Sequence, residues 1–298
     1  MSSFRFDPVA PSTGDQKDAE NRPVTISPWR RGRPVRRVLR VRASRSNLLL
    51  YTLSLAIFFG AWTGIAHLAM EFGFSNAVPT PSAVLDSLRN LFASGEVVPN
   101  LLATLRRLFA GFLLAELFGV LIGIVLGLNS TLEKLFDMWI PVLLTTPSLA
   151  YAIFALLAFG LNEKAIIFAV AISTFPYILV NIIGGVKAID TSLLQMARVF
   201  RSGRLSTMSN VVLPQVVPYV LSSSRYGLGI AWKTVVVIEL LGASSGVGYQ
   251  LNYSFSIFSM SQLIAWVLVI VVVMLVIEVL VFRILERFVF RWRPKLAS

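Results

Sequence analysis

Six long apolar stretches constrain this chain of 298 residues more than any other feature of its sequence. They cover residues 47–70, 104–128, 136–160, 165–186, 214–241 and 263–282. A helix of about 20 apolar residues crosses the hydrocarbon core of a bilayer. Inside that core every backbone polar group needs an internal partner, which a helix provides. The sequence therefore predicts an all-α, polytopic membrane protein with about six transmembrane helices.

Composition agrees with this assignment. Hydrophobic residues make up 56% of the chain and charged residues 14%, whereas soluble domains carry roughly 25% charged residues. The chain therefore lacks the polar surface to face water on all sides. Cysteine is absent and His67 is the single histidine. This composition excludes disulfides, thiolate metal sites and any site needing two imidazoles, and we expect no metal.

Residues 1–46 differ from the rest of the chain. They are polar at first and then run SPWRRGRPVRRVLRVRASRS, with nine arginines between Arg22 and Arg45. The positive region is too long for a secretory signal, and the apolar stretch after it is long enough to cross a membrane. We interpret residues 1–46 as a disordered basic cytoplasmic tail, and residues 47–298 as the transmembrane domain. The formal charge of +12 is assigned to topology and membrane lipid, with no nucleic acid expected.

The distribution of positive charge predicts the orientation. Six crossings place both termini on one side, and 21 of the 27 lysines and arginines then lie on that side. Because lysine and arginine favour the cytoplasmic side, both termini are predicted to be cytoplasmic. The exceptions on the outer side are Arg89, Arg106, Arg107 and Lys164. For Arg106 and Arg107 we expect a local cause such as contact with lipid headgroups.

Two segments on the outer side have readable patterns. PTPSAVLDSLRNLFASGE predicts a short amphipathic helix that begins at Pro81 or Ser82. After the fifth stretch, Gly242–Gly246 matches the G-x-S-x-G pattern of serine hydrolases, but that chemistry needs a histidine base, and the only histidine lies in the first stretch. The glycine-rich GASSGVGYQL is instead predicted to turn into an outer re-entrant or amphipathic segment. No Walker-type phosphate loop occurs, so nucleotide hydrolysis by that route is excluded.

Small residues recur at every fourth position of the second stretch. Spacing of four places them on one helix face, where another backbone can approach closely. The sequence thus predicts a packing seam formed by Gly111, Ala115, Gly119, Gly123 and Gly127.

Helix breakers interrupt the third and fifth stretches and mark candidates for the translocation pathway. They are Pro141, Pro147, Pro214, Pro218, Gly227 and Gly229. Broken backbone at membrane depth is tolerated beside protein or a water-filled cavity. The alternative is a kinked helix buried in a bundle without a cavity. With the polar groups inside the spans, this reasoning gives six candidate pathway residues: Glu116, Ser222, Arg225, Lys233, Thr234 and Glu239.

The charges among these residues allow two interpretations. An ionised group at the bilayer centre costs about 2.5–3.5 kcal/mol on insertion scales, so Glu116 should face water or a partner such as Arg225 or Lys233. Cations beside hydroxyl groups suit a small oxyanion. Alternatively, Arg225 and Lys233 neutralise Glu116 and Glu239, which leaves a path without charge preference.

The loop over residues 187–213 is the most informative segment. Asp190, Thr191 or Ser192 can cap a short helix, and Ser202-Gly203 is predicted to end it. The apolar residues of this helix fall at helical spacing. They are Leu193, Leu194, Ala197 and Phe200.

This loop, with its Val211-Val-Leu-Pro214 ending, resembles the cytoplasmic coupling loop of binding-protein-dependent ABC importer permeases. The family signature is E-A-A, three residues and a glycine, followed by a hydrophobic-x-L-P ending. Counting back from Pro214 places Gln195, Met196 and Ala197 on the E-A-A positions and Arg201 on the glycine position. Gly203 is expected to supply the turn two residues late.

The resemblance extends over about residues 48–293 and is closest to the nitrate, sulfonate, taurine and bicarbonate branch of these permeases. Many pieces match in order, which makes the resemblance specific. The pieces are Val78-Pro-Thr-Pro-Ser82, Leu105-Arg-Arg107, Thr174-Phe-Pro-Tyr177, Arg225 with Trp232-Lys233, Glu239-Leu-Leu-Gly-Ala-Ser-Ser-Gly-Val-Gly-Tyr249, Leu285-Glu-Arg287 and Arg291-Trp-Arg293.

The resemblance implies a type I ABC importer permease in the bacterial inner membrane. Such a permease imports a small anionic solute, of nitrate, bicarbonate, sulfonate or carboxylate type, by alternating access. It is no enzyme and holds no cofactor. ATP and Mg²⁺ bind to a dimer of ATPase subunits, a second copy or a homologous chain completes the permease, and an extracytoplasmic solute-binding protein delivers the solute.

Energy would enter through a helix over residues 195–204 that docks on the ATPase. The resemblance assigns ATPase coupling to Asp190, Gln195, Met196, Ala197, Arg198, Arg201, Gly203 and Arg204. Two alternatives from other classes remain at this point. One is a secondary transporter or channel that works without an ATPase, and the other is a membrane scaffold that conducts nothing.

Overall fold

The structure is a computed structural model that describes residues 45–73, 77–282 and 284. The predicted basic tail, except for Arg45 and Ser46, and the arginines after Phe282 lie outside these residues. The chain divides into two units, residues 1–55 and residues 56–298. The second unit contains the helical bundle discussed below.

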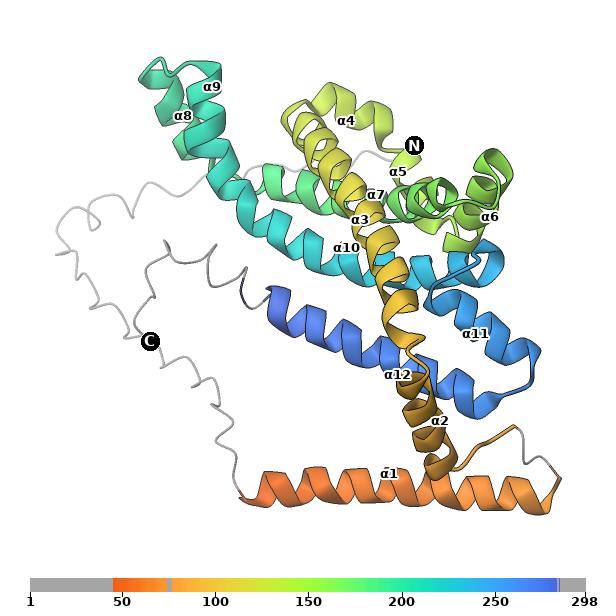
Figure 1. Ribbon diagram of the computed structural model, residues 1–298. Coiled ribbons are helices and arrows are strands. Elements are labelled where there is room, and N and C mark those ends of the chain that lie inside the picture. The colour runs from red at the N-terminus through yellow and green to blue at the C-terminus, as the bar shows by residue number, and fades with distance from the viewer. Residues whose placement is uncertain (1–44, 74–76, 283, 285–298) are drawn as a thin grey trace, which may run out of the picture. The chain divides into compact units, whose positions relative to one another are not determined.

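All regular secondary structure in the described part of the chain is helical, which confirms the predicted all-α class (Figure 1). The α-helices are α1 (Arg45–Glu71), α2 (Pro81–Ala93), α3 (Val97–Leu128), α4 (Ser130–Phe136), α5 (Trp139–Thr145), α6 (Ser148–Phe159), α7 (Glu163–Lys187), α8 (Thr191–Val199), α9 (Arg204–Thr207), α10 (Leu213–Gly242), α11 (Val247–Ser256) and α12 (Met260–Ile277). Two π-helical segments, η1 (Met208–Val212) and η2 (Glu278–Phe282), adjoin α10 and α12.

Among the described residues, four helices can cross a membrane by length and composition: Leu49–Glu71, Val97–Leu128, Glu163–Lys187 and Met260–Leu280. Two bent pairs raise the number of spans to six if each pair crosses once. One pair is α5 with α6, which meet at 93°, and the other is Leu205–Gly242 with α11, which meet at 50°. The predicted interruption of the third stretch is therefore confirmed at Pro147, whereas Pro141 lies inside α5 and does not break it. Pro147 adopts an extended conformation there and separates α5 from α6.

The fifth predicted stretch is more regular than its prolines and glycines suggested. The helix α10 runs unbroken through Pro218, Gly227 and Gly229, so the expected break inside this stretch is wrong. Pro214 lies in the first turn of α10, where its missing N–H group is not needed. The irregular backbone lies just before it, in η1.

The predicted glycine seam is confirmed as the contact between α3 and α7. A β-carbon at Gly119 would lie 2.7 Å from Ile178 Cγ2, and one at Gly123 would lie 2.8 Å from Ile182 Cβ. Small residues at the seam therefore let the two helices pack with their backbones close together.

Two adjacent glycines in α7 give a matched test of this packing. A β-carbon at Gly185 would lie 2.5 Å from Tyr219 Cγ of α10, whereas nothing lies within 4 Å of one at Gly184. We expect Gly185→Ala to lower the free energy of unfolding by about 1–3 kcal/mol through overpacking. Gly184→Ala should be neutral, or stabilising by up to about 1 kcal/mol, because alanine favours helix. Thermal unfolding in detergent measures both variants, and equal midpoints would contradict the packing described here.

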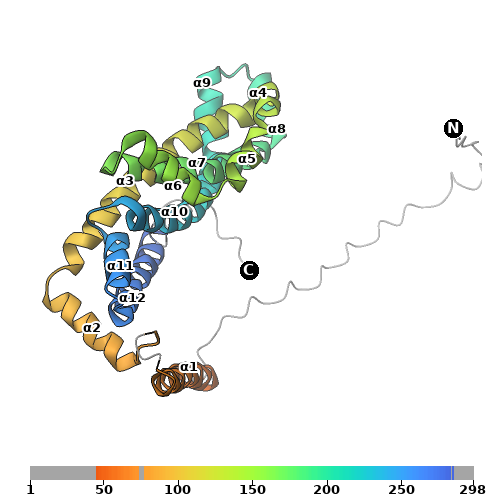
Figure 2. The ribbon, with the colours of Figure 1, turned by 90° about the vertical axis from the view of Figure 1, so that its right-hand side faces the viewer.

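The two ends of the bundle carry different elements. Both views place α4, α8 and α9 at one end and α2 at the other (Figures 1 and 2). At the first end, Lys187 of α7 forms an ion pair with Glu133 of α4. The helix α2 begins at Pro81, as predicted, and the Thr80 hydroxyl caps it by accepting a hydrogen bond from the Ala83 N–H at 3.3 Å. The predicted turn after the fifth stretch leads into α11.

Candidate functional site

A polar cavity of about 290 Å³ lies at the break between α5 and α6. The broken pair provides half of its wall, α7 contributes two side chains, and α10 contributes three. The lining residues are Leu144, Thr145, Thr146, Pro147, Ser148, Tyr151, Ser173, Tyr177, Ile230, Lys233 and Thr234. Lys233 and Thr234 are two of the predicted pathway residues.

Two tyrosines satisfy backbone carbonyls that the break leaves without helical partners. The Tyr151 hydroxyl donates to the Leu143 carbonyl at 2.8 Å, and the Tyr177 hydroxyl donates to the Leu144 carbonyl at 3.2 Å. An unpaired carbonyl at membrane depth is costly, so these bonds stabilise the break. Sequence reasoning singled out Pro147 but missed both tyrosines as site residues. Tyr177 was named only as part of the Thr174-Phe-Pro-Tyr177 piece that matches the permease family.

Most hydroxyl groups in the cavity wall already donate to the backbone. The Thr145 hydroxyl bonds the Pro141 carbonyl at 2.8 Å, and the Thr234 hydroxyl bonds the Ile230 carbonyl at 3.1 Å. The donor proton of each of these hydroxyls is therefore used within its own helix. Within the part of the chain that the structure describes, the Lys233 ammonium forms no ion pair and the Ser148 hydroxyl forms no hydrogen bond. Lys233 and Ser148 are therefore the side chains in the cavity wall whose hydrogen-bond donors have no partner among the described residues.

A second cavity, of about 580 Å³, lies between α10 and the α12–η2 segment. Its lining residues are Ser222, Arg225, Tyr226, Gly229, Ile230, Trp232, Lys233, Met274, Glu278 and Phe282. Ile230 and Lys233 line both cavities. Arg225 forms an ion pair with Glu278 at 2.9 Å and lies 5.9 Å from the Phe282 ring centroid. Lys233 is therefore the cation that both cavities share.

Glu116 lines neither cavity. Its Oε1 accepts a hydrogen bond from the Ser224 hydroxyl of α10 at 2.7 Å, whereas Lys233, one of the partners expected for it, forms no ion pair with it. The other carboxyl oxygen, Oε2, is buried and has no hydrogen-bond partner among the described residues. Glu116 thus links α3 to α10.

Glu239 also lines neither cavity, and it lies at the centre of a buried polar cluster. Its Oε1 accepts from Arg107 at 2.7 Å, and its Oε2 accepts from the Thr104 hydroxyl at 2.7 Å and the Gly248 N–H at 3.0 Å. The side chain of Arg107 is 3% exposed and that of Glu239 is fully buried. The expected neutralisation of Glu239 by Arg225 or Lys233 is therefore wrong. Contact of Arg107 with lipid headgroups is wrong for the same reason, and its neighbour Arg106 pairs with Glu163.

The G-x-S-x-G segment is part of this cluster. Arg107 donates to the Ser245 carbonyl at 2.7 Å and to the Ser245 hydroxyl at 2.9 Å. Gly246 has a φ of 108°, and a β-carbon there would lie 2.5 Å from Glu239 Oε1. The glycine is required because the turn passes directly over the buried carboxylate. We refer below to Thr104, Arg107, Glu239 and the 245–248 turn as the Arg107–Glu239 cluster.

The predicted loop helix is present as α8, with its N-cap at Asp190. The Asp190 carboxylate accepts a hydrogen bond from the Ser192 N–H at 2.8 Å. Hydrogen bonds from the Ser192 side chain and from its backbone N–H lower the pKa of Asp190. The expected helix over residues 195–204 is wrong in its bounds, because α8 ends at Val199 and α9 begins at Arg204.

The turn that ends α8 forms at Arg201 and not at Gly203. Arg201 has a φ of 50°, and the Ser202 N–H donates to the Ala197 carbonyl at 2.9 Å. A left-handed residue at this place is the usual way to close a helix, and glycine is preferred there. Arg201 therefore adopts the backbone that the signature glycine favours, and the expectation that Gly203 supplies the turn is wrong.

The exposed surface of this loop includes several large apolar side chains. Val199 is 79% exposed and Phe200 is 76% exposed, and Met196 is also exposed. Of the residues in α8, only Ala197 is buried. Exposed apolar side chains grouped at a short helix are typical of a protein contact surface.

Comparison with known proteins identifies the family. The family described as binding-protein-dependent transport system inner membrane component matches residues 97–294. The chain belongs to this family. It is the permease subunit of an ABC importer, is embedded in the membrane and is not itself an enzyme. Family membership implies ATPase and binding-protein partners in general, and it rules out the alternatives of a self-sufficient secondary transporter and a scaffold.

Several relatives cover most of the chain. The putative aliphatic sulfonates transport permease protein SsuC of Bacillus subtilis is 32% identical over 80% of this chain and 85% of its own length. The taurine transport system permease protein TauC of Escherichia coli is 27% identical over 80% and 88%. The nitrate import permease protein NrtB of Synechococcus elongatus is 31% identical over 67% and 74%.

Solved structures agree on the fold. An inward-facing structure of the MetNI methionine ABC transporter matches with a TM-score of 0.53 and 17% identity, over 63% of this chain and 94% of the other. An amino acid ABC transporter crystallised with histidines matches with a TM-score of 0.56 and 20% identity, over 68% and 97%. At this level of identity the likeness shows the shared permease fold.

Proposed function

We propose that this permease imports a small oxyanion, of sulfonate, nitrate, bicarbonate or carboxylate type, and that Lys233 meets the anion on its way. The observation that carries the proposal is the position of Lys233. Lys233 lines both cavities, and its ammonium group has no ion pair within the described residues. The names of the relatives, which refer to aliphatic sulfonates, taurine and nitrate, support the same class of solute.

The chemistry of the first cavity suits a negative group. An ammonium forms charge-assisted hydrogen bonds to oxyanions, which are about twice as strong as neutral ones. The N-terminus of α6, at Ser148, faces the same cavity, and the dipole of a helix favours negative charge there. Because lysine has a long flexible side chain, one ammonium can serve both cavities as the helices move.

The proposed assembly uses the two ends of the bundle for different partners. A second copy of this chain or a homologous chain completes the permease. The α8–α9 loop docks on an ATPase dimer that binds ATP and Mg²⁺, through exposed residues such as Met196, Arg198 and Arg201. Both termini lie in the cytoplasm with this loop, and the solute-binding protein docks at the opposite end, near α2. The separation of α8 and α9 from α2 supports this arrangement (Figures 1 and 2).

Neutralising Lys233 tests the proposal. In proteoliposomes that contain the permease, its ATPase and the solute-binding protein, we expect Lys233→Gln to lower uptake about tenfold or more. That factor corresponds to the loss of one charge-assisted hydrogen bond. Lys233→Arg should retain part of the activity because it keeps the charge. Radiolabelled taurine, an alkanesulfonate and nitrate are the probes.

Two further variants complete the design. Lys134→Gln makes the same change at an exposed lysine of α4 and should leave uptake unchanged. Arg225→Gln tests the second cation and should have a smaller effect, because Arg225 is bound to Glu278. Full uptake by both Lys233→Gln and Arg225→Gln, with ATP hydrolysis still stimulated by the binding protein, would contradict the oxyanion proposal.

A further inference from the structure

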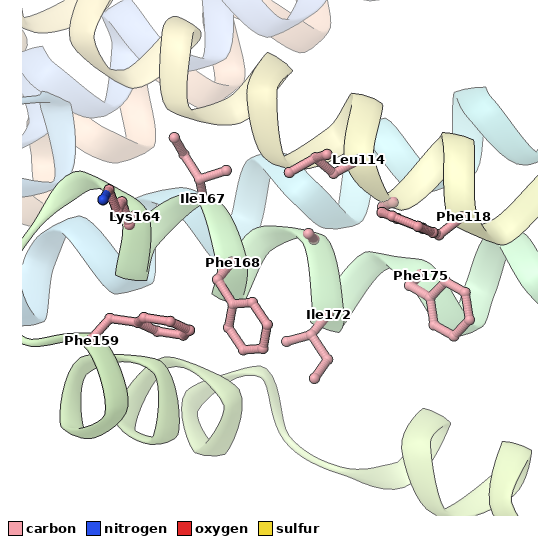
Figure 3. A pocket seen from close by; sticks show the side chains of 10 residues that line it. Leu114, Phe118, Phe159, Lys164, Ile167, Phe168, Ile172 and Phe175 are labelled. Carbon is pink, nitrogen blue, oxygen red and sulfur yellow. The ribbon is translucent and has the colours of Figure 1, made fainter.

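A third cavity, an apolar groove of about 490 Å³, lies between α3, α6 and α7 (Figure 3). None of the residues that line it lines either polar cavity. Four phenylalanines, Phe118, Phe159, Phe168 and Phe175, form much of its wall, and Phe168 and Ile172 project from α7 toward α6. The groove therefore has no evident part in moving a polar solute.

One cation stands at the end of this groove. Lys164, the second residue of α7, is the charged residue among the ten that line it. Lys164 is exposed and forms no ion pair within the described residues. Its neighbour Glu163 is engaged by Arg106 and by Arg107, the latter at 3.4 Å. The dipole of a helix also disfavours a positive charge in its first turn. Neither an ion pair among the described residues nor the helix dipole therefore stabilises the charge of Lys164.

The length of the groove matches one leaflet of a bilayer. Lys164 and Phe175 lie at its two ends along α7, eleven residues apart. At 1.5 Å per residue they are separated by about 16 Å along the helix axis. The hydrocarbon core of a bilayer is about 30 Å thick, so one leaflet measures about 15 Å. Lys164 then lies where headgroups are, and Phe175 near the bilayer midplane.

We propose that this groove binds one acyl chain of an anionic phospholipid, whose phosphate group rests on the Lys164 ammonium. The phenylalanine side chains contact the methylene groups of the acyl chain, and burial of these groups stabilises the complex relative to water. In a bilayer the acyl chains of all lipids are already out of water, so this apolar contribution does not distinguish one lipid from another. The charge of Lys164 therefore provides the selectivity for an anionic headgroup.

Binding of defined lipids to the purified permease–ATPase complex tests the proposal. Native mass spectrometry would compare dioleoylphosphatidylglycerol with dioleoylphosphatidylcholine, which have the same acyl chains. We expect retained phosphatidylglycerol to exceed phosphatidylcholine, and Lys164→Gln to lower the retained phosphatidylglycerol about tenfold. Because the Lys164 side chain is exposed, we expect Lys164→Gln to leave the packing of the core unchanged. Lys134→Gln, the same change at an exposed lysine outside the groove, should retain phosphatidylglycerol fully.

A second variant tests the groove itself. Ala171 of α7 lines the groove. The larger side chain of Ala171→Phe should fill the groove and displace the lipid, while Lys164 remains in place. Equal retention of both lipids, or phosphatidylglycerol retention unchanged by Lys164→Gln, would overturn the proposal. So would loss of the permease dimer in Ala171→Phe with no effect on bound lipid, because a second copy would then occupy the groove. None of these outcomes bears on solute uptake through Lys233.

Discussion

Replacing Glu239 with glutamine is expected to lower the free energy of unfolding by about 3 kcal/mol, because it removes the buried counter-charge of the Arg107 guanidinium and leaves only the half-exposed Glu163 carboxylate, at 3.4 Å. The side chains of Arg107 and Glu239 are both buried and 2.7 Å apart. Folded proteins are stable by only about 5–15 kcal/mol, so this loss is a large part of the total and should reduce the amount of folded protein in the membrane. Thermal unfolding, followed by size-exclusion chromatography of detergent-solubilised protein, measures the effect.

Two further variants distinguish the effect of breaking the buried Arg107–Glu239 pair from the effect of removing any charge. Arg106→Gln removes an exposed arginine from the neighbouring position, where it pairs with Glu163, and should cost at most about 1 kcal/mol. The double variant Arg107→Met with Glu239→Leu should be more stable than either single variant, because no unpaired charge stays buried. A melting temperature of Glu239→Gln equal to that of the unaltered protein would contradict the role assigned to this cluster.

Introducing proline at Ala197 is expected to abolish stimulation of ATP hydrolysis by the solute-binding protein while the permease remains in the membrane. Ala197 lies in the interior of α8, and its carbonyl accepts the hydrogen bond from Ser202 that closes the helix. Proline in a helix interior costs about 3 kcal/mol or more, which is enough to unfold a helix of two to three turns. ATPase assays of the reconstituted complex and co-purification with the ATPase measure coupling and docking.

The same helix offers a matched control. Thr191 is the first residue of α8, and Asp190 before it is extended, with a ψ of 112°. Proline is tolerated at the first helical position and favours an extended residue before it. Thr191→Pro should therefore leave coupling intact. If Ala197→Pro couples as well as Thr191→Pro, with the ATPase still bound, α8 is not the coupling element.

Features that depend on neighbouring residues could be predicted from the sequence alone. The apolar stretches located the long helices, because the length needed to cross a bilayer is a property of a continuous segment. The start of α8 was predicted within residues 190–192 and that of α2 at Pro81 or Ser82, since a cap acts within one turn of the helix. The small residues at every fourth position predicted the face of α3 that packs on α7, because helical periodicity sets which residues share a face.

The sequence could not identify which polar groups meet. It suggested Arg225 or Lys233 as partners of the buried acidic groups, but the structure pairs Glu239 with Arg107 and Arg225 with Glu278. Arg107 and Glu239 are 132 residues apart. Such a pairing depends on how helices rotate and cross, and that is decided by packing over the whole bundle. Arg107, which the topology rule treated as an outward-facing exception, is therefore one of the most buried charges of the described chain.

The helical class, the membrane setting, the helix starts and the glycine seam could be predicted from the amino-acid sequence, because bilayer length, capping and periodicity are local properties. The three-dimensional structure was needed to show how sharply the third stretch bends at Pro147, which hydroxyls cap its free carbonyls, and that Lys233 lines two cavities. It also decided that Arg201, and not Gly203, takes the left-handed turn after α8. The Tyr177 cap and the position of Lys233 depend on contacts between segments far apart in the chain, and the energy of such contacts is set by distance in space and not by separation in sequence.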